Sequence, residues 1–441
     1  MESFAPWQRQ SREKNLTALF LLTALFVLLF IGVPVAISLG LASVMTMLFF
    51  GDQTLLSSSQ KFFHTMQVYP LLAVPFFILA GTFMTTGGVA RRMVAFANAL
   101  VGHFRGGLAM AALLASAFFA AVSGSAPATV VAVGSVMIVG MVASGYTRNF
   151  AAGVICNAGT LGILIPPSLV MVVYGAITES SIGRLFIAGI LPGIILTLVM
   201  MLTVAVIARK QDMPRQERAN LKTVVKTFRE ALWGLMLVVI ILGGIYAGIF
   251  TPTEAAAVSA VYAFFIAVFV YRDITIHDVP IVLVEASKIT VMLMFIIANA
   301  FMFAFLLTTE QIPQMASELI VGMGLPVWGF LLVLNVLLLM TGNFMEPTSV
   351  VLILTPIIFP IAMEMGIDPT HLGVLMIVNM QIGLVTPPVG LNLFVTASVA
   401  ELSLEDTIKA SFPWLLVLLA VLMLITYVPW ISLVIPNLIL D

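Results

Sequence analysis

The stretches GILIPP (Gly162 to Pro167) and GLVTPP (Gly383 to Pro388) decide the fold, and they begin 221 residues apart (383 − 162). Each ends a run of small and apolar residues in a proline pair, which breaks a helix because proline lacks a backbone N–H donor. Three more pairs of prolines keep nearly the same offset: Pro34 and Pro252, Pro127 and Pro347, and Pro192 and Pro413. This register predicts a duplicated chain with interrupted apolar helices at matching positions.

The composition is that of an integral membrane protein. Of 441 residues, 61% are hydrophobic and 9% are charged, whereas charged residues make up about 25% of an ordinary soluble domain. A membrane-spanning barrel would show alternating segments of about ten residues, so the long apolar runs predict an all-α fold. The first run lacks a cleavage site of small residues, and no removable signal peptide is expected. The apolar runs, which suit spans of about 20 residues or helical hairpins, cover 16–50, 68–86, 107–144, 150–178, 184–208, 231–250, 253–271, 288–309, 326–363, 371–398 and 411–436.

The duplication predicts two inverted repeats, 1–208 and 231–441, joined by a cytoplasmic linker, 209–230. In each repeat the expected order is scaffold spans, a re-entrant helical hairpin, a broken helix and a final span. In the first repeat these elements are 16–50 and 68–86, then 107–144, 150–178 and 184–208. In the second they are 231–271 and 288–309, then 326–363, 371–398 and 411–436.

Basic residues set the expected orientation. Seven of the nineteen Lys and Arg residues lie between Arg209 and Arg229, which places the linker in the cytoplasm by the positive-inside rule. No cation lies between Lys288 and Lys409. The second hairpin is therefore expected to enter the membrane from outside, and the first from the cytoplasm.

Two features of the topology stay open. Counting crossings from the linker puts the N-terminus outside, whereas three basic residues before the first span favour the inside: Arg9, Arg12 and Lys14. Segments 87–105 and 310–325 mix apolar and polar residues. They are predicted to be amphipathic arm helices at the membrane surface, with short loops as the alternative.

Four breaks in the helices are expected to converge on one place. Non-helical backbone is tolerated inside a bilayer only where protein buries it or it lines a cavity, because each unpaired polar group costs several kcal/mol. Carbonyls and hydroxyls at the breaks supply oxygen ligands of the kind that hard cations prefer, and free helix N-termini can receive a carboxylate. The breaks are the hairpin tips SGSAPAT (Ser123 to Thr129) and TGNFMEPTS (Thr341 to Ser349), and the segments 157–167 and 379–388.

Each polar residue at the breaks also has a purely structural interpretation. Ser125 or Thr348 can bond to its own helix backbone, and Asn157 or Asn379 can hold two helices together. Glu346 can complete a cation site, take a proton, or cap the helix that begins near Pro347. The recurrence of hydroxyls and prolines in both halves favours a functional role for the group as a whole.

Several function classes lack the residues they need. The sequence has no HExxH metal motif and no GxxxxGK[ST] phosphate loop, and no basic stripe with aromatics for nucleic acid. Its single cysteine, Cys156, excludes disulfides and cysteine clusters within the chain. An intramembrane enzyme using Ser123 or Ser125 would lack a base, because the four histidines lie near span ends. A passive channel remains the alternative, although opposed hairpins around a midplane site better suit alternating access in a secondary transporter.

From about Leu16 to Pro436 the chain resembles the large membrane subunit of tripartite ATP-independent periplasmic (TRAP) transporters of the C4-dicarboxylate type. The resemblance implies a sodium-driven elevator of the ion-transporter superfamily, in a bacterial inner membrane, importing an anion such as succinate, malate or fumarate. A sialic acid or another sugar acid is the alternative substrate. The most specific motifs are GGIYAGIFTPTEAAAV (Gly243 to Val258), GILIPPS (Gly162 to Ser168), NFMEPTSVVLILTP (Asn343 to Pro356) and GLVTPPVGLNLFV (Gly383 to Val395).

The resemblance also implies partners and site residues. The partners are a small four-helix membrane subunit on a separate chain and a periplasmic substrate-binding protein; no cofactor is expected besides the coupling sodium, and no enzymatic activity. Sodium ligands are expected at Ser123, Gly124, Asn157, Gly162, Thr341, Gly342, Asn343, Gly383 and Thr386. Residues between the tips are assigned to substrate: Ser125, Pro127, Thr129, Glu346, Pro347, Thr348 and Ser349.

Overall fold

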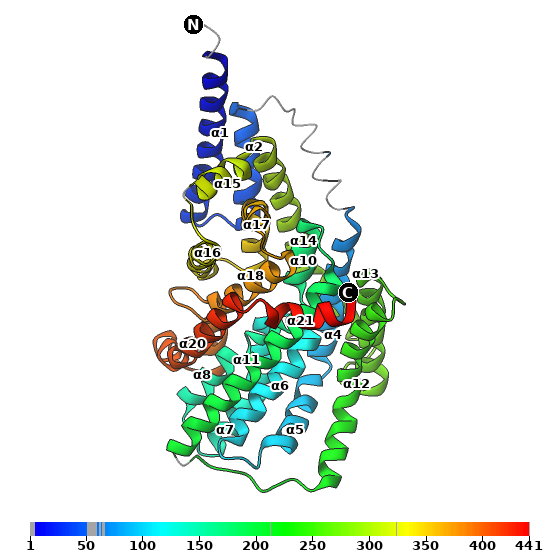
Figure 1. Cartoon of the computed structure of the whole chain (residues 1–441). Helices are drawn as coiled ribbons and strands as arrows, with labels where there is room; N and C mark the ends of the chain where they lie inside the picture. The colour runs from blue at the N-terminus through cyan, green and yellow to red at the C-terminus, as the bar shows by residue number, and fades with distance from the viewer. Residues whose placement is uncertain are drawn as a thin grey trace.

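The computed structural model describes residues 5–50, 60, 63, 67–211, 213–322 and 324–440, and every regular element within these residues is helical. Among them, nine helical stretches are long and apolar enough to cross a membrane. Figure 1 shows α1 and α2 at one end of the molecule and the loop from α11 to α12 at the opposite end. The chain is therefore an all-α protein of the multi-pass membrane type.

The first half contains α1 (Ala5–Phe30), α2 (Val35–Phe50), the short 3-10 helix η1 (Tyr69–Leu72), α4 (Ala73–Thr86) and α5 (Val89–Val101). It continues with a helical hairpin, α6 (Gly107–Ser123) and α7 (Ala126–Ala143). A broken helix follows, made of α8 (Arg148–Ala158), α9 (Leu161–Leu164) and α10 (Leu169–Thr178). The half ends with α11 (Ile182–Lys210).

The second half follows the same order. It contains α12 (Leu221–Tyr246), α13 (Pro252–Phe265) with the π-helix η2 (Ile266–Val270), α14 (Val279–Thr309) and α15 (Ile312–Gly322). The hairpin is α16 (Val327–Gly342) and α17 (Pro347–Glu364), and the broken helix is α18 (Pro369–Gly383) and α19 (Leu391–Ala400). The final helices are α20 (Leu404–Tyr427) and α21 (Trp430–Leu440).

Several predicted bounds differ from the structure. The loop between α11 and α12 is shorter than the expected linker 209–230. Asn220 caps α12 by accepting a 2.8 Å hydrogen bond from the Thr223 N–H, so the helix begins at Leu221. The span predicted at 288–309 begins earlier, at Val279, with a proline in its first turn. Segment 231–271 forms two helices, as its two apolar runs predict, whereas the single span expected at 411–436 is divided between α20 and α21. The two arm segments are helices, α5 and α15, rather than loops.

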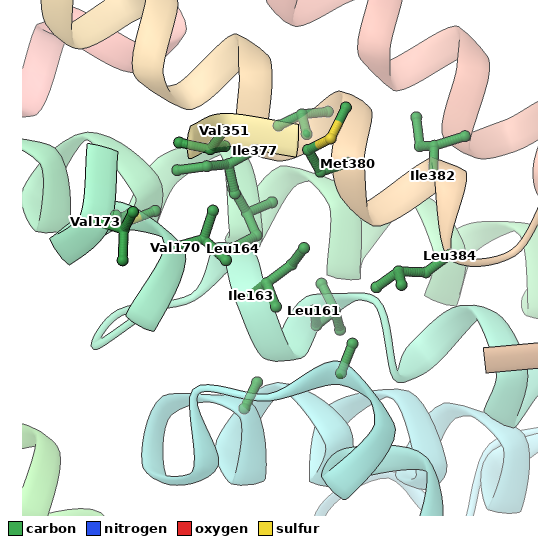
Figure 2. Close-up of a cluster of buried hydrophobic side chains, with 14 of the residues drawn as sticks. Leu161, Ile163, Leu164, Val170, Val173, Val351, Ile377, Met380, Ile382 and Leu384 are labelled. Carbon is green, nitrogen blue, oxygen red and sulfur yellow. The ribbon is translucent and has the colours of Figure 1, made fainter. Parts of the chain in front are cut away.

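The broken helices of the two halves pack against each other in the core. Figure 2 shows Leu164 and Val170 of the first half gathered with Val351 and Ile377 of the second, and all four side chains are buried. A few residues away, the Tyr174 hydroxyl donates a 2.7 Å hydrogen bond to the carbonyl of Pro369. The core thus fixes the position of one break relative to the other.

Candidate functional site

The first hairpin tip touches the first broken helix through backbone atoms. A Cβ added to Gly162 would lie 2.4 Å from the Ser125 carbonyl oxygen. Gly124, which ends α6 with a φ of +60°, faces the Pro167 carbonyl oxygen, and a Cβ there would lie 3.0 Å from it. Gly162 is required because the backbone of the tip approaches it closely. Gly124 is required for the same reason and also because of its left-handed conformation.

The second hairpin tip meets the second broken helix in the same manner. A Cβ on Gly383 would lie 2.8 Å from the Gly342 carbonyl oxygen. The Gly390 N–H donates a 3.2 Å hydrogen bond to the Asn343 carbonyl. The glycines of GILIPP and GLVTPP therefore occupy equivalent places, each where a tip crosses a break.

Hydroxyl groups of the first tip bond to one another and to the tip backbone. Ser123 Oγ lies 3.1 Å from Thr129 Oγ1, which donates to the Ser125 carbonyl at 2.8 Å. Ser125 itself is the N-cap of α7, and its side chain accepts no capping hydrogen bond among the described residues. The N-terminal N–H groups of α7 are thus left without the side-chain acceptor that commonly fills this position.

At the second tip the corresponding helix start carries its own carboxylate. Glu346 caps α17: the Thr348 hydroxyl donates to Glu346 Oε1 at 2.7 Å, and the Ser349 N–H donates to Oε2 at 3.2 Å. The structure therefore shows the capping role that the sequence left open. The same carboxylate also faces the cavity described next.

One cavity of about 690 Å³ lies between the two tips. Helices α2, α4 and α14 close its other side, with Thr82, Thr85 and Glu285 among the lining residues. Among the described lining residues, Glu285 and Glu346 are the only charged ones, and none is Lys, Arg or His. The predicted site residues that line it are Ser123, Gly124, Ser125, Pro127, Glu346, Pro347, Thr348 and Ser349.

The other predicted residues lie outside the lining of this cavity. Thr129 is fully buried in the first tip, and Gly162, Gly342 and Gly383 form the backbone crossings described above. The hydroxyls of Thr341 and Thr386 donate to carbonyls four residues earlier in the chain, Leu337 and Ile382. The hydroxyls of these two side chains are therefore already bonded to their own helices, which is the purely structural interpretation.

Three asparagine amide oxygens within the four breaks are buried and have no hydrogen-bond partner among the described residues: Oδ1 of Asn157, of Asn343 and of Asn379. The Nδ2 group of Asn157 is held by the Gly153 carbonyl and by Ser411 Oγ, both at 2.8 Å, so its oxygen has a fixed direction. A buried acceptor without a donor is costly. A cation would satisfy it, and oxygen is the ligand type that hard cations take.

Four cavity or break residues were missed by reasoning from the sequence. Glu285 lies just before the apolar run that begins at 288, and Thr82 and Thr85 lie in a run treated as scaffold alone. Gln381 is fully buried in α18, and neither its amide oxygen nor its nitrogen has a partner within the described part of the chain. Only for Glu285 did the sequence hold a signal, Pro280 in the first turn of a longer helix.

Comparisons with known proteins agree with this architecture. The sequence profile described as "Tripartite ATP-independent periplasmic transporter, DctM component" matches residues 22–431. This chain belongs to the DctM family. As a DctM component it is a multi-pass transporter permease of the bacterial inner membrane, and it is not an enzyme.

Individual relatives of this DctM chain cover nearly all of it. The "C4-dicarboxylate TRAP transporter large permease protein DctM" of Pseudomonas aeruginosa is 60% identical over 400 residues, 91% of this chain and 94% of that protein. The "Isethionate TRAP transporter permease protein DctMQ" of Oleidesulfovibrio alaskensis is 43% identical over 94% of this chain and 65% of its own length. The YdaH transporter of Alcanivorax borkumensis has a TM-score of 0.61 at 14% identity, covering 96% of this chain and 99% of YdaH. That likeness shows the fold alone.

Proposed function

We propose that this DctM chain is the large permease of a TRAP transporter that imports a C4-dicarboxylate together with sodium ions. The substrate class rests on the P. aeruginosa relative, which is 60% identical and is named for C4-dicarboxylates. The coupling rests on one observation, the cavity between the two tips whose charged lining groups are both carboxylates, Glu285 and Glu346.

The charges of this cavity favour binding of a cation together with the substrate. A C4-dicarboxylate brings two negative charges beside the carboxylates of Glu285 and Glu346, and repulsion among these like charges opposes its binding unless a cation offsets them. The unpartnered oxygens of Asn157 and Asn343 and the carbonyls of the tips supply ligands for sodium beside the cavity. Sodium held there would offset the anionic charge and order the tips before the substrate binds.

Within the cavity, the first tip is the better receptor for a substrate carboxylate. The N-terminus of α7 lacks a side-chain cap within the described residues, whereas that of α17 is filled by Glu346. A helix N-terminus carries about +0.5 charge and free N–H donors. One substrate carboxylate would therefore bind at the start of α7, with Ser125 and Thr348 beside it.

The arrangement of the cavity suits an elevator mechanism. One wall belongs to the hairpins, and the opposite wall belongs to α2, α4 and α14. In the proposed cycle the hairpins and broken helices carry the ion and substrate across as one body, while α12, α13 and the arm helices stay in place. The two inverted repeats, 1–208 and 231–441, remain part of this proposal.

We further propose that the small four-helix subunit is a separate chain and that a periplasmic binding protein delivers the substrate. Support comes from the tripartite description of the family and from the longer DctMQ relative, of which this chain covers 65%. No observation in the cavity favours a sialic acid or other sugar acid over the dicarboxylate.

Reconstitution of all three components in liposomes tests the proposal. Uptake of labelled succinate should depend on an inward sodium gradient, saturate, and be inhibited by malate and fumarate but not by a sialic acid. Equal uptake with sodium replaced by choline would refute the coupling. Uptake without saturation or counterflow would instead indicate a passive channel.

A further inference from the structure

A second cavity, of about 860 Å³, lies between α5, α12 and η2. Its lining contains five basic residues and one acidic one, Glu230. This cavity shares no lining residue with the cavity between the tips. The basic residues are Arg91 and Arg92 of α5 and Lys222, Lys226 and Arg229 of α12.

The α5 side of the cavity is already ordered. Arg91 and Arg92 both pair with Asp273, and the Arg92 guanidinium lies over the Tyr271 ring, 3.8 Å from its centroid. Tyr271 is itself fixed, since its hydroxyl donates to the Glu230 carbonyl at 2.6 Å. These contacts hold Arg92 and Tyr271 in place, and the single carboxylate of Asp273 offsets one of the two arginine charges.

The α12 side carries uncompensated charge. Lys222, Lys226 and Arg229 recur at a spacing of four and three residues, so they share one face of the helix. All three are exposed, and none forms an ion pair with another residue that the structure describes. An anion in this cavity would therefore meet three free cations.

The position of the cavity along α12 indicates a lipid rather than a soluble anion. The three cations precede the apolar part of the helix, and Trp233 follows one turn later, at the level where aromatic side chains mark the membrane interface. Val225, Trp233 and Val270 also line the cavity and are exposed. They offer apolar surface beside the charges, which a free phosphate would not use.

We infer that this cavity binds the headgroup of an anionic phospholipid from the cytoplasmic leaflet, with its phosphates on the three α12 cations and its acyl chains along Trp233 and Val270. Basic pockets between membrane helices on the cytoplasmic side suit lipids with two phosphates, such as cardiolipin. Each basic residue near the surface strengthens such binding about fivefold. Loss of all three cations should weaken it about a hundredfold.

Native mass spectrometry of the permease purified with its small subunit tests this inference. The probe is cardiolipin added in neutral detergent, compared with phosphatidylcholine. The wild type should retain cardiolipin selectively, and the triple variant K222Q, K226Q, R229Q should bind it about a hundredfold more weakly. The matched control, K210Q, R215Q, R218Q, removes three cations from the same cytoplasmic region outside the cavity and should bind as the wild type does.

A second measurement does not depend on whether the triple variant folds. Brominated cardiolipin should quench the fluorescence of Trp233, seen as the difference between the wild type and W233F, and millimolar pyrophosphate should not reverse the quenching. Equal binding by the triple variant and its control would overturn the inference. Displacement by pyrophosphate would show a soluble-anion site, and loss of binding in the presence of the small subunit would show a protein-covered surface; either result also overturns it.

Discussion

Gly162 approaches the Ser125 carbonyl so closely that a Cβ on the glycine would stand 2.4 Å from that oxygen. Gly383 stands in the same relation to the Gly342 carbonyl, at 2.8 Å. A flexible side chain can move away from an added methyl group, but backbone atoms cannot do so without moving the chain. A methyl group at either glycine must therefore displace a hairpin tip. Both tips line the cavity, so a displaced tip should change how the cavity binds substrate.

Gly162→Ala should therefore lower sodium-dependent uptake at least tenfold. Overpacking of this kind costs about 1–3 kcal/mol, and the strain falls on the tip. The check is the initial rate of succinate uptake in liposomes. Gly140→Ala is the matched control, because no described atom lies within 4 Å of a Cβ added there. Equal rates for the two variants would contradict the assigned role of the crossing.

Glu285→Gln should lower the KM for the dicarboxylate about fivefold. Removing one of the two cavity carboxylates reduces repulsion of the dianion, by about 1 kcal/mol for charges with access to water. The measurement is uptake against substrate concentration at fixed sodium. Glu217→Gln, in the exposed linker, removes the same charge away from the cavity and should leave KM unchanged. An unchanged KM in Glu285→Gln would remove this residue from the site.

Gly373→Ala should destabilise the fold without acting on the site. A Cβ there would lie 2.7 Å from the Tyr174 ring, in the core between the broken helices, and the expected cost is about 1–3 kcal/mol. Thermal unfolding in detergent should show a lower midpoint. Gly243→Ala, which adds a Cβ in open space among the described residues, should not lower it.

Much of this architecture follows from local chemistry that the sequence displays. Glycine, proline and hydroxyl residues mark the tips and breaks because each has a backbone property that no other residue supplies. The repeated offset then indicates which breaks are equivalent. Helix starts were predicted less well. Asn220 caps α12 inside the expected linker 209–230, and the polar first turns of this helix do not produce an apolar run in the sequence.

The sequence could not predict which residues form the wall of the cavity opposite the hairpin tips. Glu285 and Thr82 face the tips only because α14 and α4 pack beside the hairpins, and such packing depends on contacts far apart in the chain. For Glu346 the sequence left three roles open. Since the carboxylate both caps α17 and faces the cavity, two of these interpretations were never mutually exclusive.

Asn157→Ala should raise the sodium concentration for half-maximal uptake at least tenfold. The substitution removes an amide oxygen that has no partner among the described residues, and a lost cation ligand weakens sodium binding directly. Ser411→Ala separates this role from simple positioning, since it removes the 2.8 Å hydrogen bond to Asn157 Nδ2 and keeps the oxygen. That variant should change the sodium requirement less than threefold, because the Gly153 carbonyl still holds the amide. The check is uptake against sodium concentration at saturating substrate; equal shifts in the two variants would assign Asn157 to packing between α8 and α20.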